Sequence, residues 1–154
     1  MNDDELMSGV RDAFELLDPV PADVLAAARA SIAWRTPSAA LAELAHDRPA
    51  RAAAGVRGAA DRPLTFACPG SAAEVEAVEI EVAERGRHRE ITGRLVPSAA
   101  AVVQVRHRDL PPGGLTAHAE PAGLFCVPDV PEGLVSLVFR LDDGSSIVTS
   151  WIHL

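Results

Sequence analysis

The stretch AGLFCVPDVPEGLVSLVFRLDDGSSIVTSWIHL, residues 122–154, decides how the second half of this chain folds. Apolar and polar side chains alternate along it, as they do in a β-strand with one buried face. Two turns interrupt the alternation, at residues 131–133 (Pro-Glu-Gly) and 142–145 (Asp-Asp-Gly-Ser). The second turn is a hairpin signal, because Asp and Gly tolerate the left-handed backbone conformation that tight turns require. The stretch therefore predicts short antiparallel strands.

The same two-residue period begins near Leu64 and runs to the C-terminus. Turn signals rich in Pro and Gly divide this region into segments at a spacing of roughly 8–12 residues, which is typical of an antiparallel sandwich. No segment of helical length separates these segments, which argues against a parallel sheet. We expect a mainly β protein, with a seven- to eight-stranded antiparallel β-sandwich over residues 64–154.

Residues 1–47 have a different, helical period. The stretch DDELMSGVRDAFELLD (3–18) spaces its apolar residues as one stripe of an amphipathic helix. Pro19 and Pro21 cannot continue this helix, and PADVLAAARASIAWR (21–35) predicts a second one. Thr36 is a candidate N-cap for a third short helix over residues 36–47. We therefore expect an N-terminal segment of two or three short helices.

Residues 48–63, RPARAAAGVRGAADRP, hold one large apolar residue, Val56. Such a stretch buries too little to hold itself in place, so we interpret it as a linker. The predicted organisation is a helical interaction arm (1–47), a linker (48–63) and a β-sandwich domain (64–154).

The formal net charge of -8 over 154 residues argues against a nucleic-acid or anionic-membrane surface, which needs concentrated basic side chains. The N-terminus, MNDDELMSG, lacks the apolar run of a signal peptide, and no stretch approaches the roughly 20 apolar residues of a membrane span. We expect a cytoplasmic protein with no membrane partner.

Catalytic, cofactor-binding and metal-ligating sets are not expected. No serine lies in a G-x-S-x-G motif, and neither Cys68 nor Cys126 sits in a C-x-x-C motif. We expect both cysteines to be buried free thiols, with a disulfide between them as the alternative. His107 and His118 are expected as exposed strand residues, with a paired-His metal site across a hairpin as the alternative.

The glutamates of EVEAVEIEVAE (74–84) alternate along a predicted strand. A solvated sheet face that also discourages edge-to-edge pairing explains them, and contact with a basic partner is the alternative.

The stretch AHAEPAGLFCVPDVPEGLVSLVFRL (117–141) resembles transthyretin-like and carboxypeptidase regulatory-like domains. The positions that match their pattern are Gly123, Phe125, Val130, Pro131, Gly133, Ser136 and Leu137. The sequence departs from that pattern at Glu120-Pro121 and at Val135, which stands near the usual Tyr. The resemblance covers about residues 74–154 and implies a prealbumin- or Ig-like sandwich. It implies little about function, because such sandwiches occur in many unrelated proteins.

The stretch FELLDPVPADVLAAARASIAWRTPSAALAELAHD (14–47) is similar to the start of small actinobacterial proteins encoded beside sigma factors, often together with CHAT-type protease-like proteins. This resemblance implies a protein partner, either a sigma factor or a CHAT-type protein, and an anti-sigma-like role.

We expect the helices to carry the function, because their apolar stripes must cover the sandwich, each other or a partner. The expected partner-binding residues are Leu6, Val10, Phe14, Leu17, Val24, Leu25, Ile32 and Trp34. The predicted function is non-catalytic regulation by steric occlusion. The alternatives are a sandwich that binds a carbohydrate or peptide and an accessory subunit of a CHAT-type protease system. The sequence leaves the oligomeric state open.

Overall fold

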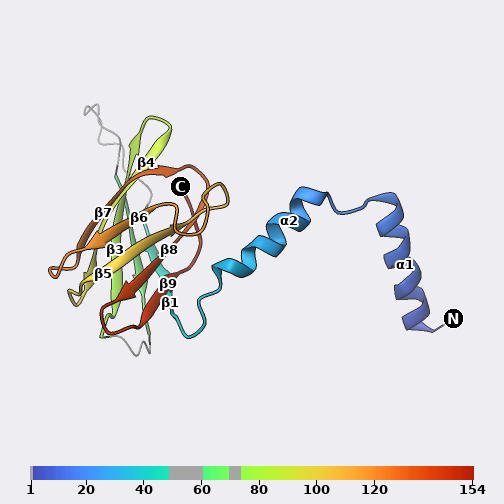
Figure 1. Cartoon of the computed structure of the whole chain (residues 1–154), viewed down its shortest axis with the longest axis horizontal. Helices are drawn as coiled ribbons and strands as arrows, with labels where there is room; N and C mark the ends of the chain where they lie inside the picture. The colour runs from blue at the N-terminus through green and yellow to red at the C-terminus, as the bar shows by residue number, and fades with distance from the viewer. Residues whose placement is uncertain (1, 49–60, 70–73) are drawn as a thin grey trace. The chain divides into compact units, whose positions relative to one another are not determined.

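The computed structural model describes residues 2–48, 61–69 and 74–154 (Figure 1). They form two compact units, Met1–Arg35 and Thr36–Leu154. The first unit is helical and the second contains every described strand, so the chain is mainly β, as the alternation predicts.

None of the described helices combines the length and apolar character needed to span a membrane.

The helical unit contains α1 (Asp3–Leu17), α2 (Ala22–Ala30) and a 3-10 turn, η1 (Ser31–Trp34). The first helix begins with a capping box: Asn2 Oδ1 accepts a hydrogen bond from the Glu5 backbone N–H at 2.8 Å, and the Glu5 carboxylate accepts one from the Asn2 N–H at 3.2 Å. The first two predicted helices are confirmed.

The third predicted helix is wrong, because residues Ala40–Asp47 form strand β1. Alanine and leucine favour a helix locally, but pairing with two distant strands overrides that preference. Thr36 is not a helix cap; its hydroxyl accepts a hydrogen bond from Arg106. Most of the predicted linker, residues 49–60, lies outside the described residues, and its last two residues already belong to a strand.

The described residues form a sheet of ten strands, more than the seven to eight predicted. After β1 they are β2 (Arg62–Ala67), β3 (Ala77–Arg85), β4 (His88–Val96), β5 (Ala101–Arg106), β6 (Thr116–Ala119), β7 (Leu124–Pro131), β8 (Leu134–Leu141), β9 (Ser146–Thr149) and β10 (Ile152–His153). The order is β6-β5-β8-β9-β1-β2-β3-β4-β7, with β10 on β8. Since the turn between β6 and β7 joins the two ends of this path, the sheet is nearly barrel-shaped.

Strand β1 divides the sheet into two layers. Its first three residues pair with β9 in the only parallel ladder among the described strands, and the rest pairs antiparallel with β2. At the change of partner, the Ser150 N–H donates to the Ala42 carbonyl at 2.9 Å, and Ser150 Oγ accepts from the Leu44 N–H at 3.0 Å. We call β6-β5-β8-β9 with β10 the β5–β8 layer, and β2-β3-β4-β7 the β3–β4 layer.

The two layers enclose one hydrophobic core. Its largest wholly buried side chains include Leu64, Phe66, Ile80, Ile91, Leu95, Leu137, Phe139 and Ile147. The rings of Phe125 on β7 and Phe139 on β8 meet edge to face, with centroids 5.3 Å apart, so an aromatic pair joins the layers.

The C-terminal stretch folds as its turns predict. Gly133 and Gly144 both have positive φ angles, +128° and +85°, in the two predicted turns. Leu154 is buried, and it exchanges two backbone hydrogen bonds with Gly133. The end of the chain is thus part of the packed fold.

Candidate functional site

The predicted partner-binding residues lie where the sequence places them, on helices. Four are on α1, two on α2 and two on η1; in chain order they are Leu6, Val10, Phe14, Leu17, Val24, Leu25, Ile32 and Trp34. No side chain of α1, α2 or η1 is buried, so the helices build no core of their own. Within the helical unit these residues do not form one packed cluster.

The four residues on α1 nevertheless share one face. At 100° per residue, Leu6, Val10, Phe14 and Leu17 fall on a single stripe. Glu5 and Asp12 fall on the opposite side of the helix. Phe14 remains 65% exposed and is the largest apolar side chain on the stripe. The arrangement is an amphipathic helix whose apolar side is uncovered in its unit.

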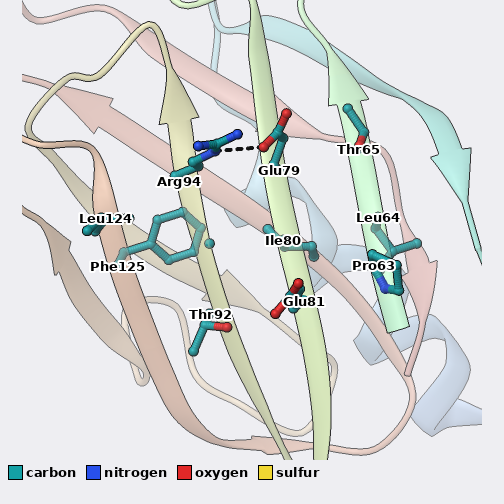
Figure 2. A pocket seen from close by; sticks show the side chains of 11 residues that line it. Pro63, Leu64, Thr65, Glu79, Ile80, Glu81, Thr92, Arg94, Leu124 and Phe125 are labelled. Atoms are coloured by element: carbon teal, nitrogen blue, oxygen red, sulfur yellow. Dashed lines mark hydrogen bonds and ion pairs between the residues drawn. The ribbon is translucent and has the colours of Figure 1, made fainter. Parts of the chain in front are cut away.

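A second candidate surface is an open depression of about 440 Å³ in the β3–β4 layer, which the sequence did not predict (Figure 2). The side chains drawn come from β2, β3, β4 and β7. Strand register places Thr65, Glu79, Arg94 and Leu124 in one row across it, and Pro63, Glu81 and Thr92 in the next.

The charges in this depression are largely compensated. Arg94 Nε donates to Glu79 Oε2 at 2.7 Å, shown by the dashed line in Figure 2. Glu79 and Glu81 share the outer face of β3, as the alternation predicts, whereas Val78, Ile80 and Val82 are buried. The depression thus offers one carboxylate, Glu81, with threonine hydroxyls and apolar walls around it.

Another open depression, of about 480 Å³, lies beside the turn between β8 and β9. It is lined by Glu74, Asp142 and Asp143 together with residues 97–100. Hydrogen bonds from the hydroxyl and the backbone N–H of Ser145 lower the pKa of Asp143. This carboxylate therefore already accepts two hydrogen bonds within its own turn. Across the described ranges, no group of three or more His, Cys, Asp or Glu residues is arranged to hold a metal ion.

His107 has a structural role. It is buried, and its Nδ1 accepts a hydrogen bond from the Asp109 N–H at 3.1 Å. The proton is therefore on Nε2, which donates to the Glu132 carbonyl at 3.0 Å in the turn between β7 and β8. His118 lies on β6 opposite Val102, so the two histidines do not form the alternative metal pair. The expectation that His107 is exposed is wrong.

The two cysteines are free thiols in different environments. Cys68 is buried, as expected, and burial raises the pKa of its thiol. Cys126 is exposed, which corrects the expectation of a buried thiol. Its neighbours Phe125 and Val127 both face the core, so strand alternation turns Cys126 outward. The alternative disulfide between them is not formed.

No protein-family model, curated protein or solved structure matches this chain.

Proposed function

We propose that this protein is a non-catalytic regulator that binds a protein partner through its N-terminal helices. The observation that carries the proposal is the apolar stripe of α1, none of whose residues is buried. A helix presented in this way fits helix-in-groove recognition, in which side chains at i, i+4 and i+7 enter an apolar groove. The stripe supplies such anchors: Val10, Phe14 and Leu17 have this spacing, and Leu6 lies one turn before Val10.

The resemblance of residues 14–47 to proteins encoded beside sigma factors makes a sigma factor the first partner to test, with a CHAT-type protein second. The helices would act in the cytoplasm by steric occlusion, covering a surface that the partner needs for its own contacts. The β unit, which we take to be a prealbumin-like sandwich, would then serve for sensing or recruitment.

The test is a matched set of aspartate substitutions on α1. Phe14→Asp and Leu17→Asp place a charge in the stripe, whereas Leu16→Asp places the same charge outside it on a residue that is 82% exposed. Co-purification from the native host with mass spectrometry identifies the bound protein, and its affinity is then measured with purified components.

We expect Phe14→Asp and Leu17→Asp to reduce affinity at least about 30-fold, as loss of a buried anchor does, while Leu16→Asp changes it little. The thermal transition of the β unit should be the same in all three variants, because every residue of its described hydrophobic core belongs to the β unit itself. Normal binding by Phe14→Asp would show that the stripe is not the interface.

A second candidate function is ligand binding by the depression in the β3–β4 layer. Glu81, Thr65 and Thr92 provide hydrogen-bonding groups there, and Pro63 and Leu124 provide apolar walls. This favours a peptide over a carbohydrate, because the described lining lacks an exposed aromatic ring on which a sugar stacks. A thermal-shift screen of glycans and peptides distinguishes the two candidates: stabilisation that is lost in Glu81→Gln supports a ligand site.

The third candidate, an accessory subunit of a CHAT-type system, predicts stable co-purification with such a protein even when the stripe is disrupted.

A further inference from the structure

The depression in the β3–β4 layer is a groove that runs across four strands. Its floor is one row of register partners: Leu64, Ile80, Gly93 and Phe125. The three side chains of this row are buried in the core, and the backbone of the row belongs to the ladders between β2, β3, β4 and β7. A ligand in the groove is therefore recognised by the side chains that flank the floor.

The two rows of outward side chains on either side of the floor form the walls (Figure 2). They are two residues apart on each strand, so about 6.5 Å separates the rows, and the four strands give the groove a length of about 14 Å. Three alternate side chains of an extended chain span almost the same length, about 13–14 Å. The groove thus matches an extended segment that lies across the strands and inserts residues i−2, i and i+2.

The charges of the walls do not balance. In one wall Arg94 forms an ion pair with Glu79. In the other wall Glu81 is exposed, and its cross-strand neighbours are Pro63 and Thr92, neither of which is basic. Glu81 forms no ion pair with any residue in the described ranges. The groove therefore carries one uncompensated negative charge, on the carboxylate of Glu81.

Apolar side chains lie at the two ends of the groove. Pro63 is exposed at the β2 end, and Leu124 is 54% exposed at the β7 end. The next residues beyond the lining are His46, opposite Thr65, and Cys126, opposite Thr92. One carboxylate thus stands between two apolar ends, with threonine hydroxyls beside it.

This arrangement favours a single positive charge flanked by apolar groups. A purely apolar ligand would cover the Glu81 carboxylate without giving it a partner, which is unfavourable. An anion would be repelled by Glu81, because Arg94 is already neutralised by Glu79. A polyamine brings several positive charges, whereas the lining offers one unpaired carboxylate. An arginine side chain brings one charge, and its planar guanidinium can donate two hydrogen bonds to a carboxylate and others to nearby hydroxyls.

We propose that this groove binds an extended segment of a protein partner that carries one arginine with apolar residues two positions before and after it. The guanidinium pairs with Glu81, and the two apolar side chains cover Pro63 and Leu124. This inference rests on the second candidate function above and names the ligand class that the depression takes.

The test is an NMR titration of the ¹⁵N-labelled full chain with the end-blocked peptide Leu-Ser-Arg-Ser-Leu. A peptide with citrulline in place of arginine keeps the shape and removes the charge. We expect the arginine peptide to shift amide signals of the floor and wall residues, and the citrulline peptide to bind about fivefold more weakly, as loss of a partly exposed ion pair implies.

Glu81→Gln should weaken binding of the arginine peptide by the same factor and leave the citrulline peptide unaffected, since both changes remove one interaction. Glu76→Gln is the matched control, because Glu76 is an exposed glutamate outside the lining, and it should leave binding unchanged. Glu81 is exposed, so its replacement should preserve the unfolding midpoint, which checks the fold of each variant.

The proposal is overturned if the two peptides bind equally, if Glu81→Gln binds the arginine peptide as the wild type does, or if spermidine binds the groove more tightly than the peptide. If the thermal-shift screen finds another ligand for the depression while the arginine peptide shifts none of these amides, the second candidate function stands and this inference fails. Phe14→Asp should not alter peptide binding, which separates this test from that of the helical stripe.

Discussion

The ring of Phe125 on β7 lies against Gly93 on β4, its register partner in the β3–β4 layer. A Cβ added at Gly93 would stand 2.7 Å from Phe125 Cζ and 2.5 Å from the Glu79 carbonyl oxygen. The missing side chain therefore makes room for the ring that packs edge to face on Phe139 across the core. The glycine and the aromatic ring act as one packing unit.

This packing predicts that Gly93→Ala destabilises the β unit. The added methyl group must displace either an aromatic ring or a strand backbone, and overpacking of this kind costs about 1–3 kcal/mol. Urea denaturation measures the change in the free energy of unfolding. Gly9→Ala is the control, because a Cβ at Gly9 meets nothing within 4 Å. A Gly93→Ala protein as stable as the wild type would show that the strands separate at little cost.

The strands after Leu64 were predictable because local alternation matches the face that each strand buries. Strand β1 was not, although it contains similar residues. Its pairing with β9 joins Ala40 to Ile147, more than a hundred positions along the chain, and no local pattern encodes such a contact. The helix-favouring composition of residues 36–47 therefore led to the wrong prediction of a helix, because tertiary pairing decides that residues 40–47 form a strand.

The alternation along the strand predicts an exposed Cys126, whereas the general tendency of cysteine to be buried led to the wrong expectation. Phe125 and Val127 are both buried, and a period of two places the residue between them on the other face. We expect one thiol to react rapidly with Ellman's reagent in the folded protein and a second after unfolding. The first is the exposed Cys126; the second is Cys68, whose burial blocks access and raises the pKa of its thiol.

Cys126→Ser supplies the control for this measurement. It should remove the rapid reaction and leave the slow one. Rapid modification of two thiols in the folded protein would mean that the end of β2 opens readily.

The role of His107 predicts a large loss of stability on its removal. His107→Ala leaves a cavity and removes the partners of the Asp109 N–H and the Glu132 carbonyl, which together cost about 2–4 kcal/mol. His118→Ala, at an exposed position on β6, should change the free energy of unfolding by less than about 0.5 kcal/mol. Equal stability of the two variants in urea denaturation would contradict the structural role of His107.

The strand order of the β5–β8 layer shows where sequence analysis reaches its limit. The absence of acidic residues from β5, β8 and β9 is visible in the sequence. Their assembly into one layer depends on strand order, and β8 lies between β5 and β9 although the chain visits β6 and β7 between β5 and β8.

The ion pair between Asp47 and Arg62 predicts how stability depends on pH. Arg62 Nε donates to Asp47 Oδ1 at 2.8 Å, and Arg62 Nη1 donates to the His153 carbonyl at 2.7 Å, so the pair links β1, β2 and β10. The hydrogen bond from Arg62 holds the pKa of Asp47 below its ordinary value. Because the folded state binds the proton less tightly than the unfolded state, the contribution of the pair to stability is complete above about pH 4. It is lost as the pH falls through the folded-state pKa.

Since the pair is partly exposed, Asp47→Asn should lower the free energy of unfolding by only about 0.2–1 kcal/mol at pH 7, and by less near pH 3. The test is urea denaturation of the wild type, Asp47→Asn, Arg62→Gln and the double variant at both pH values. These four proteins together give the coupling free energy between Asp47 and Arg62. A coupling free energy that does not decrease at pH 3 would show that the ionised carboxylate is not its source.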